Sequence, residues 1–307
     1  MSRNVPTPAP ESADPAPGSR AIAAALRAQQ QLLASRTVRL KGASVDDVHQ
    51  ARVATRRLRS LLRTFCPLLD RQRVRRYRAD LRSCARALAE VRESDVRQQL
   101  LLALVQRDAA MPRAGFRRLS GQLEATGDAA RGALRRRISL TDWKALCRAL
   151  RAHAASDSLV RRRDASLDEV LERVERSWRK PRKLLEAGPR DLEQLHELRL
   201  ALKHYRYALE PVAGVAPREA ARLLRRLRAA QDRIGEHRDL VLAREWVDEH
   251  AESLGRVLVR RLKRLVDQRT ADLLDEIIRC IRRVVPAQDR WRRASRRFRS
   301  AGTAGPG

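Results

Sequence analysis

The sequence has few aromatic residues, no close cysteine pair and no long apolar run. Aromatic side chains make up 3% of the 307 residues, so Leu, Val and Ala must fill most of any core. The four cysteines, Cys66, Cys84, Cys147 and Cys280, form no Cys-x-x-Cys pair, which is typical of small buried side chains in a reducing compartment. No apolar run approaches the ~18 residues of a membrane helix, and the N-terminus lacks the apolar segment of a secretory signal. We therefore expect a cytoplasmic protein with no membrane partner.

Signatures of several enzyme classes are missing as well. The chain has no Walker-type phosphate loop, no evident nucleophile–base pair and no carboxylates clustered for a metal. His49 and His196 have no second ligand at metal-binding spacing, so neither predicts a metal site. We expect no catalytic residue, no metal and no cofactor. An enzyme that acts on phosphoanhydrides is the alternative, and an assay of phosphate release would test it.

Strand signals are scarce, because no segment alternates between apolar and polar residues and β-branched runs are few. The apolar residues instead recur at helical spacing, which predicts an all-α fold. The Pro- and Ala-rich residues 1–18 and the last residues, 300–307, are predicted to be disordered. Helices are predicted near residues 20–38, 44–66, 71–108, 113–153 (broken), 166–187, 190–212, 217–250 and 253–285, with a basic helical extension at 290–299.

Positive charge, in contrast, is abundant. The chain has 67 Lys and Arg residues against 37 Asp and Glu residues, a formal net charge of +30. Charge of this size repels itself and attracts polyanions. Nearly all of these cations are arginines, whose planar guanidinium binds phosphate in a bidentate manner.

One helical pattern occurs twice, 147 positions apart. Residues 48–59 read VHQARVATRRLR and residues 195–206 read LHELRLALKHYR, so both fit His-x-x-Arg-x-x-x-(Arg/Lys)-x-x-Arg. Spacings of 3, 4 and 3 place these side chains in one row on a helix, opposite an apolar face. The two rows consist of His49, Arg52, Arg56, Arg59 and Arg63, and of His196, Arg199, Lys203 and Arg206.

A row of cations is costly unless an anion lies against it. Cations one turn apart repel each other by a few tenths of a kcal/mol, and the first row contains no acidic residue. The second contains only Glu210. A polyanion would replace this repulsion with charge-assisted hydrogen bonds worth ~1.5–3 kcal/mol each. A solvated basic surface is the alternative, but the repeated His-led spacing favours a binding site.

Other basic residues are secondary candidates, although each alone is better explained as solvated surface. They are Arg57, Arg78, Arg82, Arg86, Lys183, Arg225 and Arg228. Two further segments, 81–96 and 227–242, also repeat one pattern, at an offset of 146 positions. We interpret Arg92 with Glu93, and Arg238 with Asp239, as ion pairs that fix helix packing.

The length of this repeat indicates a duplicated half-domain rather than a solenoid unit. We predict two four-helix bundles related by a pseudo-two-fold axis. The first repeat would span residues 19–155 and the second residues 156–299.

At these motifs the chain resembles the CHAD family, the conserved histidine α-helical domain. The resemblance covers residues from about 20 to about 290 and implies two four-helix bundles around a basic central groove or pore. It also implies binding of inorganic polyphosphate and association with polyphosphate granules. Glu93 and Ser94 depart from the family pattern, which bears on packing more than on binding. By the resemblance, the pore would be lined by His49, Arg52, Arg56, Arg59, His196, Arg199, Lys203 and Arg206.

The leading hypothesis is therefore a non-enzymatic polyphosphate-binding protein on polyphosphate granules. Some relatives carry a triphosphatase domain, but its acidic Glu-x-Glu-x-Lys signature is absent here. The alternative is a basic helical protein that binds nucleic acid. The sequence contains no helix-turn-helix or RNP-type motif and few aromatics for base stacking.

Overall fold

The computed structural model describes residues 14–37, 44–137, 159–189 and 191–303, with isolated positions between 145 and 152. In these ranges the chain forms helices and no strand, which confirms the predicted all-α fold class. The helices are α1 (Pro17–Thr37), α2 (Val45–Thr64), α3 (Arg71–Ala87), α4 (Ala89–Gln106), α5 (Arg113–Arg137), α7 (Leu167–Ala187), α8 (Leu192–Leu209), α9 (Pro217–Glu249), α10 (Ala251–Leu254), α11 (Arg256–Arg282) and α12 (Val284–Thr303), with short 3-10 segments at Cys66–Leu68 and Glu210–Val215.

Several helix boundaries differ from the predicted ones. The helix predicted over 71–108 is two helices, α3 and α4, which meet at the buried residue Leu88. No glycine or proline marks this break, so the sequence pattern did not reveal it. α1 begins and α12 ends inside the stretches predicted to be disordered, whereas residues 1–13 and 304–307 lie outside the described residues.

The two motif helices begin in the same way. The Ser44 side chain caps α2 by accepting from the Asp47 N–H at 3.1 Å, and Asp191 caps α8 by accepting from the Gln194 N–H at 2.8 Å. Such caps satisfy N–H groups that have no partner within the helix. Each motif histidine follows its cap by the same number of residues, so both cationic rows start at the same level of their helices.

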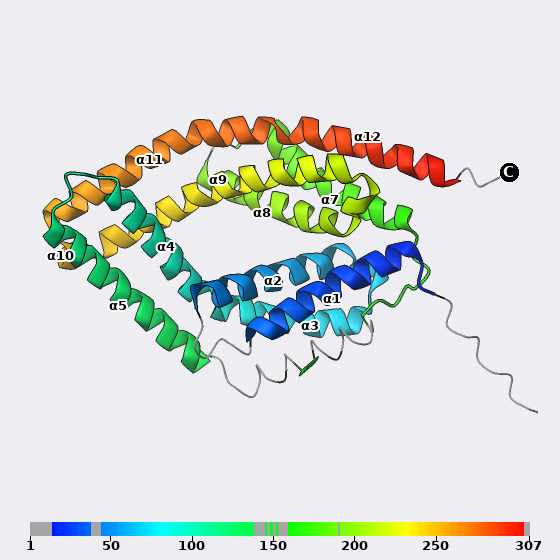
Figure 1. Cartoon of the computed structure of the whole chain (residues 1–307), viewed down its shortest axis with the longest axis horizontal. Helices are drawn as coiled ribbons and strands as arrows, with labels where there is room; N and C mark the ends of the chain where they lie inside the picture. The colour runs from blue at the N-terminus through cyan, green and yellow to red at the C-terminus, as the bar shows by residue number, and fades with distance from the viewer. Residues whose placement is uncertain are drawn as a thin grey trace, which may run out of the picture.

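Two hydrophobic cores hold the helices together. The larger core joins α1, α2, α3, α7, α8 and α12 with parts of α4, α5, α9 and α11, whereas the smaller core joins α10 with the other parts of α4, α5, α9 and α11. Figure 1 shows α4, α5 and α10 of the smaller core at one end of the molecule, and α9 and α11 extend from this end toward the other helices. Each core combines helices from both sides of residue 155. The duplication into two bundles therefore stays a prediction.

A buried polar contact joins α2 to α8. Ser60 Oγ lies 2.7 Å from His204 Nδ1, and Thr64 Oγ1 lies 3.3 Å from His204 Nε2. Burial, with a smaller effect from Arg63, lowers the pKa of His204 to about 4. Thr64 donates its own hydroxyl hydrogen to the Ser60 carbonyl at 3.1 Å, so its oxygen is left to accept from a neutral imidazole. This contact helps to hold the two motif helices side by side.

Candidate functional site

A cavity of about 730 Å³ lies between α2, α4, α8 and α9, and we call it the central cavity. It receives most of both predicted rows, because the apolar faces of α2 and α8 are buried in the larger core and the opposite faces turn inward. Seven predicted residues line it: His49, Arg52, Arg56, His196, Arg199, Lys203 and Arg206.

The remaining predicted residues lie elsewhere. Arg59 and Arg63 continue the row of α2 but are exposed and do not line the central cavity. The secondary candidates Arg78, Arg82, Arg86, Lys183, Arg225 and Arg228 are also exposed and lie outside it. The rows are thus longer than the cavity that they enter.

The structure also brings in residues that we had assigned to helix packing. Arg92, Glu93, Arg238 and Asp239 all line the central cavity. Neither arginine has a carboxylate within 4.0 Å in the described part of the chain, so the predicted ion pairs are wrong. The available signal in the sequence was that Arg92 and Arg238 occupy matching positions of the repeated segments 81–96 and 227–242.

Arg238 contacts the motif histidine of α8. Its Nη1 lies 2.9 Å from His196 Nε2 and also close to Nδ1. A guanidinium has hydrogens to donate and no lone pair to accept with, so the imidazole must accept. Burial, followed by the charge of Arg238, lowers the pKa of His196. An imidazole that accepts from Arg238 is in its neutral form, and the lowered pKa favours that form.

Charges in the central cavity are unevenly distributed. α2 and α8 contribute only cations, whereas five of the six lining carboxylates come from α9. One of these, Glu236, is already engaged by Arg269 at 2.7 Å and by Arg233 at 2.9 Å. Glu93, Asp232, Glu245 and Glu249 are exposed, so Asp239 is the carboxylate most enclosed among the cations. Burial raises the pKa of Asp239, against the opposing effect of Arg199 and Lys203.

The cations of the two rows are poorly solvated and repel one another. Lys203 is 8% exposed, and burial, followed by Arg199 and Arg56, lowers its pKa to about 5. Burial and then Arg56 lower the pKa of Arg52 to about 10. Removing water from like charges disfavours their charged forms, and a bound anion would reverse this effect.

Several polar atoms around the cavity have no hydrogen-bond partner in the described part of the chain. Among the described residues, the buried Nε of Arg199, the Nε1 of Trp246 and both side-chain polar atoms of Gln231 make no hydrogen bond. Gln231 is 1% exposed. A buried unsatisfied donor costs about 1–3 kcal/mol. These atoms are available to a bound ligand.

Gly235 allows α9 to approach the cationic row of α8 closely. A Cβ at this position would lie 2.8 Å from Arg199 Nη2, a distance that real Cβ atoms do not show. The absence of a side chain therefore gives the Arg199 guanidinium its place against the helix backbone.

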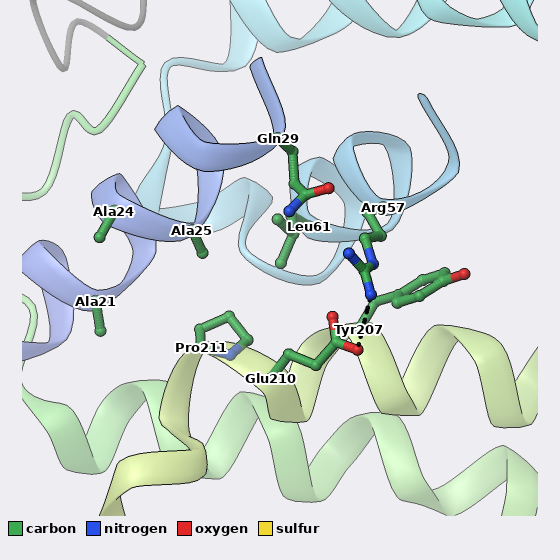
Figure 2. A pocket seen from close by; sticks show the side chains of 9 residues that line it. All are labelled: Ala21, Ala24, Ala25, Gln29, Arg57, Leu61, Tyr207, Glu210 and Pro211. Atoms are coloured by element: carbon green, nitrogen blue, oxygen red, sulfur yellow. Dashed lines mark hydrogen bonds and ion pairs between the residues drawn. The ribbon is translucent and has the colours of Figure 1, made fainter. Parts of the chain in front are cut away.

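A second cavity of about 310 Å³, the side pocket, lies next to the central cavity, and Tyr207 lines both. Figure 2 shows Arg57 and Glu210 facing each other across it, with Arg57 Nη2 3.4 Å from Glu210 Oε1. Arg206 Nε lies 3.7 Å from the same carboxylate oxygen. The two guanidinium carbons lie 5.6 Å and 4.8 Å from the centroid of the Tyr207 ring. The secondary candidate Arg57 is therefore partly neutralised.

The sequence model of the CHAD domain matches residues 21–248, which is most of the chain. The chain belongs to the CHAD family. The fold agrees with two solved structures. PptA from Streptomyces chartreusis is 21% identical, with a TM-score of 0.69 over 90% of this chain and 99% of that chain. The CHAD domain from the plant Ricinus communis is 24% identical, with a TM-score of 0.69 over 90% of this chain and 95% of that chain.

At these identities the two structures establish the fold of this CHAD protein and nothing about its ligand. No curated protein matches the chain. In the part of the chain that the structure describes, no helix is both long and apolar enough to cross a membrane. The same residues contain no group of three or more His, Cys, Asp or Glu side chains that could hold a metal ion.

Proposed function

We propose that this CHAD protein binds inorganic polyphosphate in the central cavity. One observation carries the proposal. Arg52, Arg56, Arg199 and Lys203 line one cavity from two helices, and no carboxylate lies within 4.0 Å of any of them in the described chain. An arrangement of this kind is unfavourable when empty and favourable around an anion.

The spacing of the donors suits a polymeric anion. Successive residues of a row lie about one helical turn, ~5.4 Å, apart along α2 and along α8. A single phosphate can reach only part of such a row, whereas a chain of phosphates can engage many donors at once. Guanidinium groups give bidentate contacts to phosphate oxygens, and each contact after the first benefits from a raised effective concentration.

The role that we propose is binding rather than catalysis, on polyphosphate granules. The carboxylates of α9 face the cationic rows, and one of them, Asp239, is enclosed. They would oppose an anion near α9 and favour its placement along α2 and α8. The wild-type protein should release phosphate from polyphosphate no faster than a variant in which the cavity cations are replaced. A labelled variant in which the cavity cations are replaced should no longer localise to polyphosphate granules.

Nucleic acid is the alternative ligand. Stacking of bases on aromatic side chains supplies much of the affinity of single-strand binders. The aromatic side chains that line the central cavity are Tyr207 and Trp246, and both are buried at 2% exposure. A ligand without bases therefore fits this cavity better.

The test is a competition at matched phosphate concentration between polyphosphate, RNA and DNA. Polyphosphate should displace both nucleic acids, whereas neither should displace polyphosphate. The triple change Arg52→Gln, Arg56→Gln and Lys203→Gln should weaken polyphosphate binding at least tenfold through loss of charge-assisted hydrogen bonds. Arg222→Gln, Arg225→Gln and Arg228→Gln together are the control, because these exposed residues of α9 lie outside the cavity. Equal losses in the two variants would refute the site.

A further inference from the structure

We propose that a long polyphosphate leaves the central cavity along an external arginine strip, so that the protein prefers long chains to short ones. The strip consists of Arg59 and Arg63 on α2 and of Arg78 and Arg82 on α3. The inference rests on the proposed function, because it extends the same site onto the surface.

The strip is continuous with the cavity. Arg52 and Arg56 line the cavity, and Arg59 and Arg63 follow them on the same face of α2. From Arg52 to Arg63 the row covers about 16 Å at ~1.5 Å per residue. The charge of Arg56 also contributes to the lowered pKa of Arg59. A chain lying on the cavity part of the row therefore meets further cations as it emerges.

α3 places a second row beside the first. Thr55 Oγ1 of α2 lies 3.5 Å from Cys84 Sγ of α3, and Tyr77 and Leu81 are buried in the core that they share with α2. Burial of this face leaves Arg78 and Arg82 exposed one turn apart, with Arg82 Nε donating to the Arg78 carbonyl at 3.4 Å.

The two rows lie close enough to influence each other. Although Arg59 is exposed overall, partial desolvation of its guanidinium and then the charges of Arg82, Arg78 and Arg63 lower its pKa. Partial desolvation and then the charge of Arg78 lower the pKa of Arg63. The four guanidinium groups thus form one cluster that joins α2 to α3.

The strip lacks counter-charges from the residues that the structure describes. Within the described ranges, none of its four arginines lies within 4.0 Å of a carboxylate. Exposed arginines elsewhere are often paired, as Arg176 is with Glu172 at 3.1 Å and Arg182 is with Glu186 at 2.7 Å. Four neighbouring cations without an internal anion are expected to attract an external one.

The preference for long polyphosphate chains follows from this geometry. A short chain can fill the central cavity without reaching the strip, whereas a long chain held in the cavity presents its next phosphates to the strip at high effective concentration. Contacts on the strip therefore add affinity only for long chains. They also release counterions and steepen the dependence of binding on salt.

The experiment compares tripolyphosphate with a long-chain polyphosphate preparation by titration calorimetry. The test variant is Arg78→Glu with Arg82→Glu, which leaves every cavity residue intact. The matched control is Arg225→Glu with Arg228→Glu, an equal change of charge at exposed positions of α9. Far-ultraviolet circular dichroism confirms that each variant remains helical.

We expect the strip variant to lose about tenfold or more in affinity for long chains, to keep wild-type affinity for tripolyphosphate and to show a shallower salt dependence. The control should change both affinities alike and by less. Equal losses for short and long chains, or no loss in the strip variant, would overturn the strip. A wild-type protein that binds neither chain would instead refute the proposed function. Loss of RNA binding alone would assign the strip to nucleic acid and also overturn the inference.

Discussion

The Glu210 carboxylate lies 3.4 Å from the Arg57 guanidinium, at the boundary between the side pocket and the central cavity. Its same oxygen lies 3.7 Å from Arg206, which lines the central cavity. Glu210 would therefore compete with a bound phosphate for contact with Arg57 and Arg206. Figure 2 shows this carboxylate directed toward Arg57 from the end of α8.

Replacing Glu210 with Gln should raise the affinity for polyphosphate about two- to fivefold, since partly exposed ion pairs contribute about 0.2–1 kcal/mol. Titration at low salt measures the change. Glu197→Gln is the control, because it removes the same charge from a carboxylate that pairs with Lys180 at 2.6 Å outside the cavity. An unchanged affinity in the Glu210 variant, or an equal gain in the control, would contradict local competition.

Lys203 makes the proposed binding dependent on pH. Burial and the neighbouring arginines hold its pKa at about 5 in the empty cavity, against 10.5 for a free lysine, so it is neutral near pH 7. A bound phosphate favours the charged form and raises this pKa, so binding takes up a proton. Affinity should therefore fall as pH rises from about 5 toward the pKa of the bound state. Calorimetry in buffers with different ionisation enthalpies counts the protons.

The variant Lys203→Met tests separately what Lys203 contributes to polyphosphate binding and to the stability of the free protein. It should weaken polyphosphate binding and reduce the proton uptake. It should also stabilise the empty protein by about 1–4 kcal/mol, because an apolar side chain replaces a poorly solvated amine. Between pH 5 and 10.5 the unfolded state holds more protons at Lys203, so the wild type gains stability as pH rises and the variant gains less. Lys183→Met, at an exposed position of α7, should leave both properties unchanged.

Gly235 offers a test of where Arg199 must lie. Gly235→Ala should push the Arg199 guanidinium away from α9, because the new Cβ would lie 2.8 Å from its Nη2. The end of this side chain can move, so we expect several-fold weaker polyphosphate binding without loss of stability. Gly121→Ala is the matched control, since a Cβ there meets nothing within 4 Å. It should stabilise α5 by about 0.5–1 kcal/mol and leave binding unchanged. Equal binding by both variants would show that the position of Arg199 is unimportant.

The helical period explains how much of the site could be predicted from the sequence. Spacings of 3 and 4 residues fix which side chains share a face, and the apolar residues opposite fix which face is buried. These rules placed Arg52, Arg56, Arg199 and Lys203 on faces that the fold brings into one cavity. The rules do not fix how far a row extends into that cavity. Arg59 and Arg63 satisfy the same period and lie outside it.

Residues whose position depends on tertiary packing could not be predicted in this way. Arg238 and Asp239 are adjacent in sequence and opposite in charge, which suggests a local ion pair. Adjacent helical residues do not face each other, however, and the packing of α9 against α8 turns both toward the cavity. The break at Leu88 was missed for a similar reason. No glycine or proline stands there, and Leu88 is buried by the packing of the helices around it.

His204 connects the two motif helices and should make stability sensitive to acid. Its pKa is about 4 in the folded protein, against 6.5 for a free histidine. The unfolded state therefore binds more protons between these values, so stability is complete above pH 6.5 and falls as pH falls through about 4. The expected loss is about 3 kcal/mol at most. Protonation would also give Nδ1 a hydrogen where it now accepts from Ser60.

The variant His204→Gln cannot titrate in this range. It should be less stable than the wild type near pH 7, by roughly 1 kcal/mol for an imperfectly replaced hydrogen bond. As the pH is lowered its stability should fall less steeply, because the carboxylates of both proteins titrate alike and only the wild type must protonate His204. Urea unfolding at a series of pH values gives the two curves. Parallel curves would show that His204 is not held neutral between α2 and α8, whereas converging curves would show that it is.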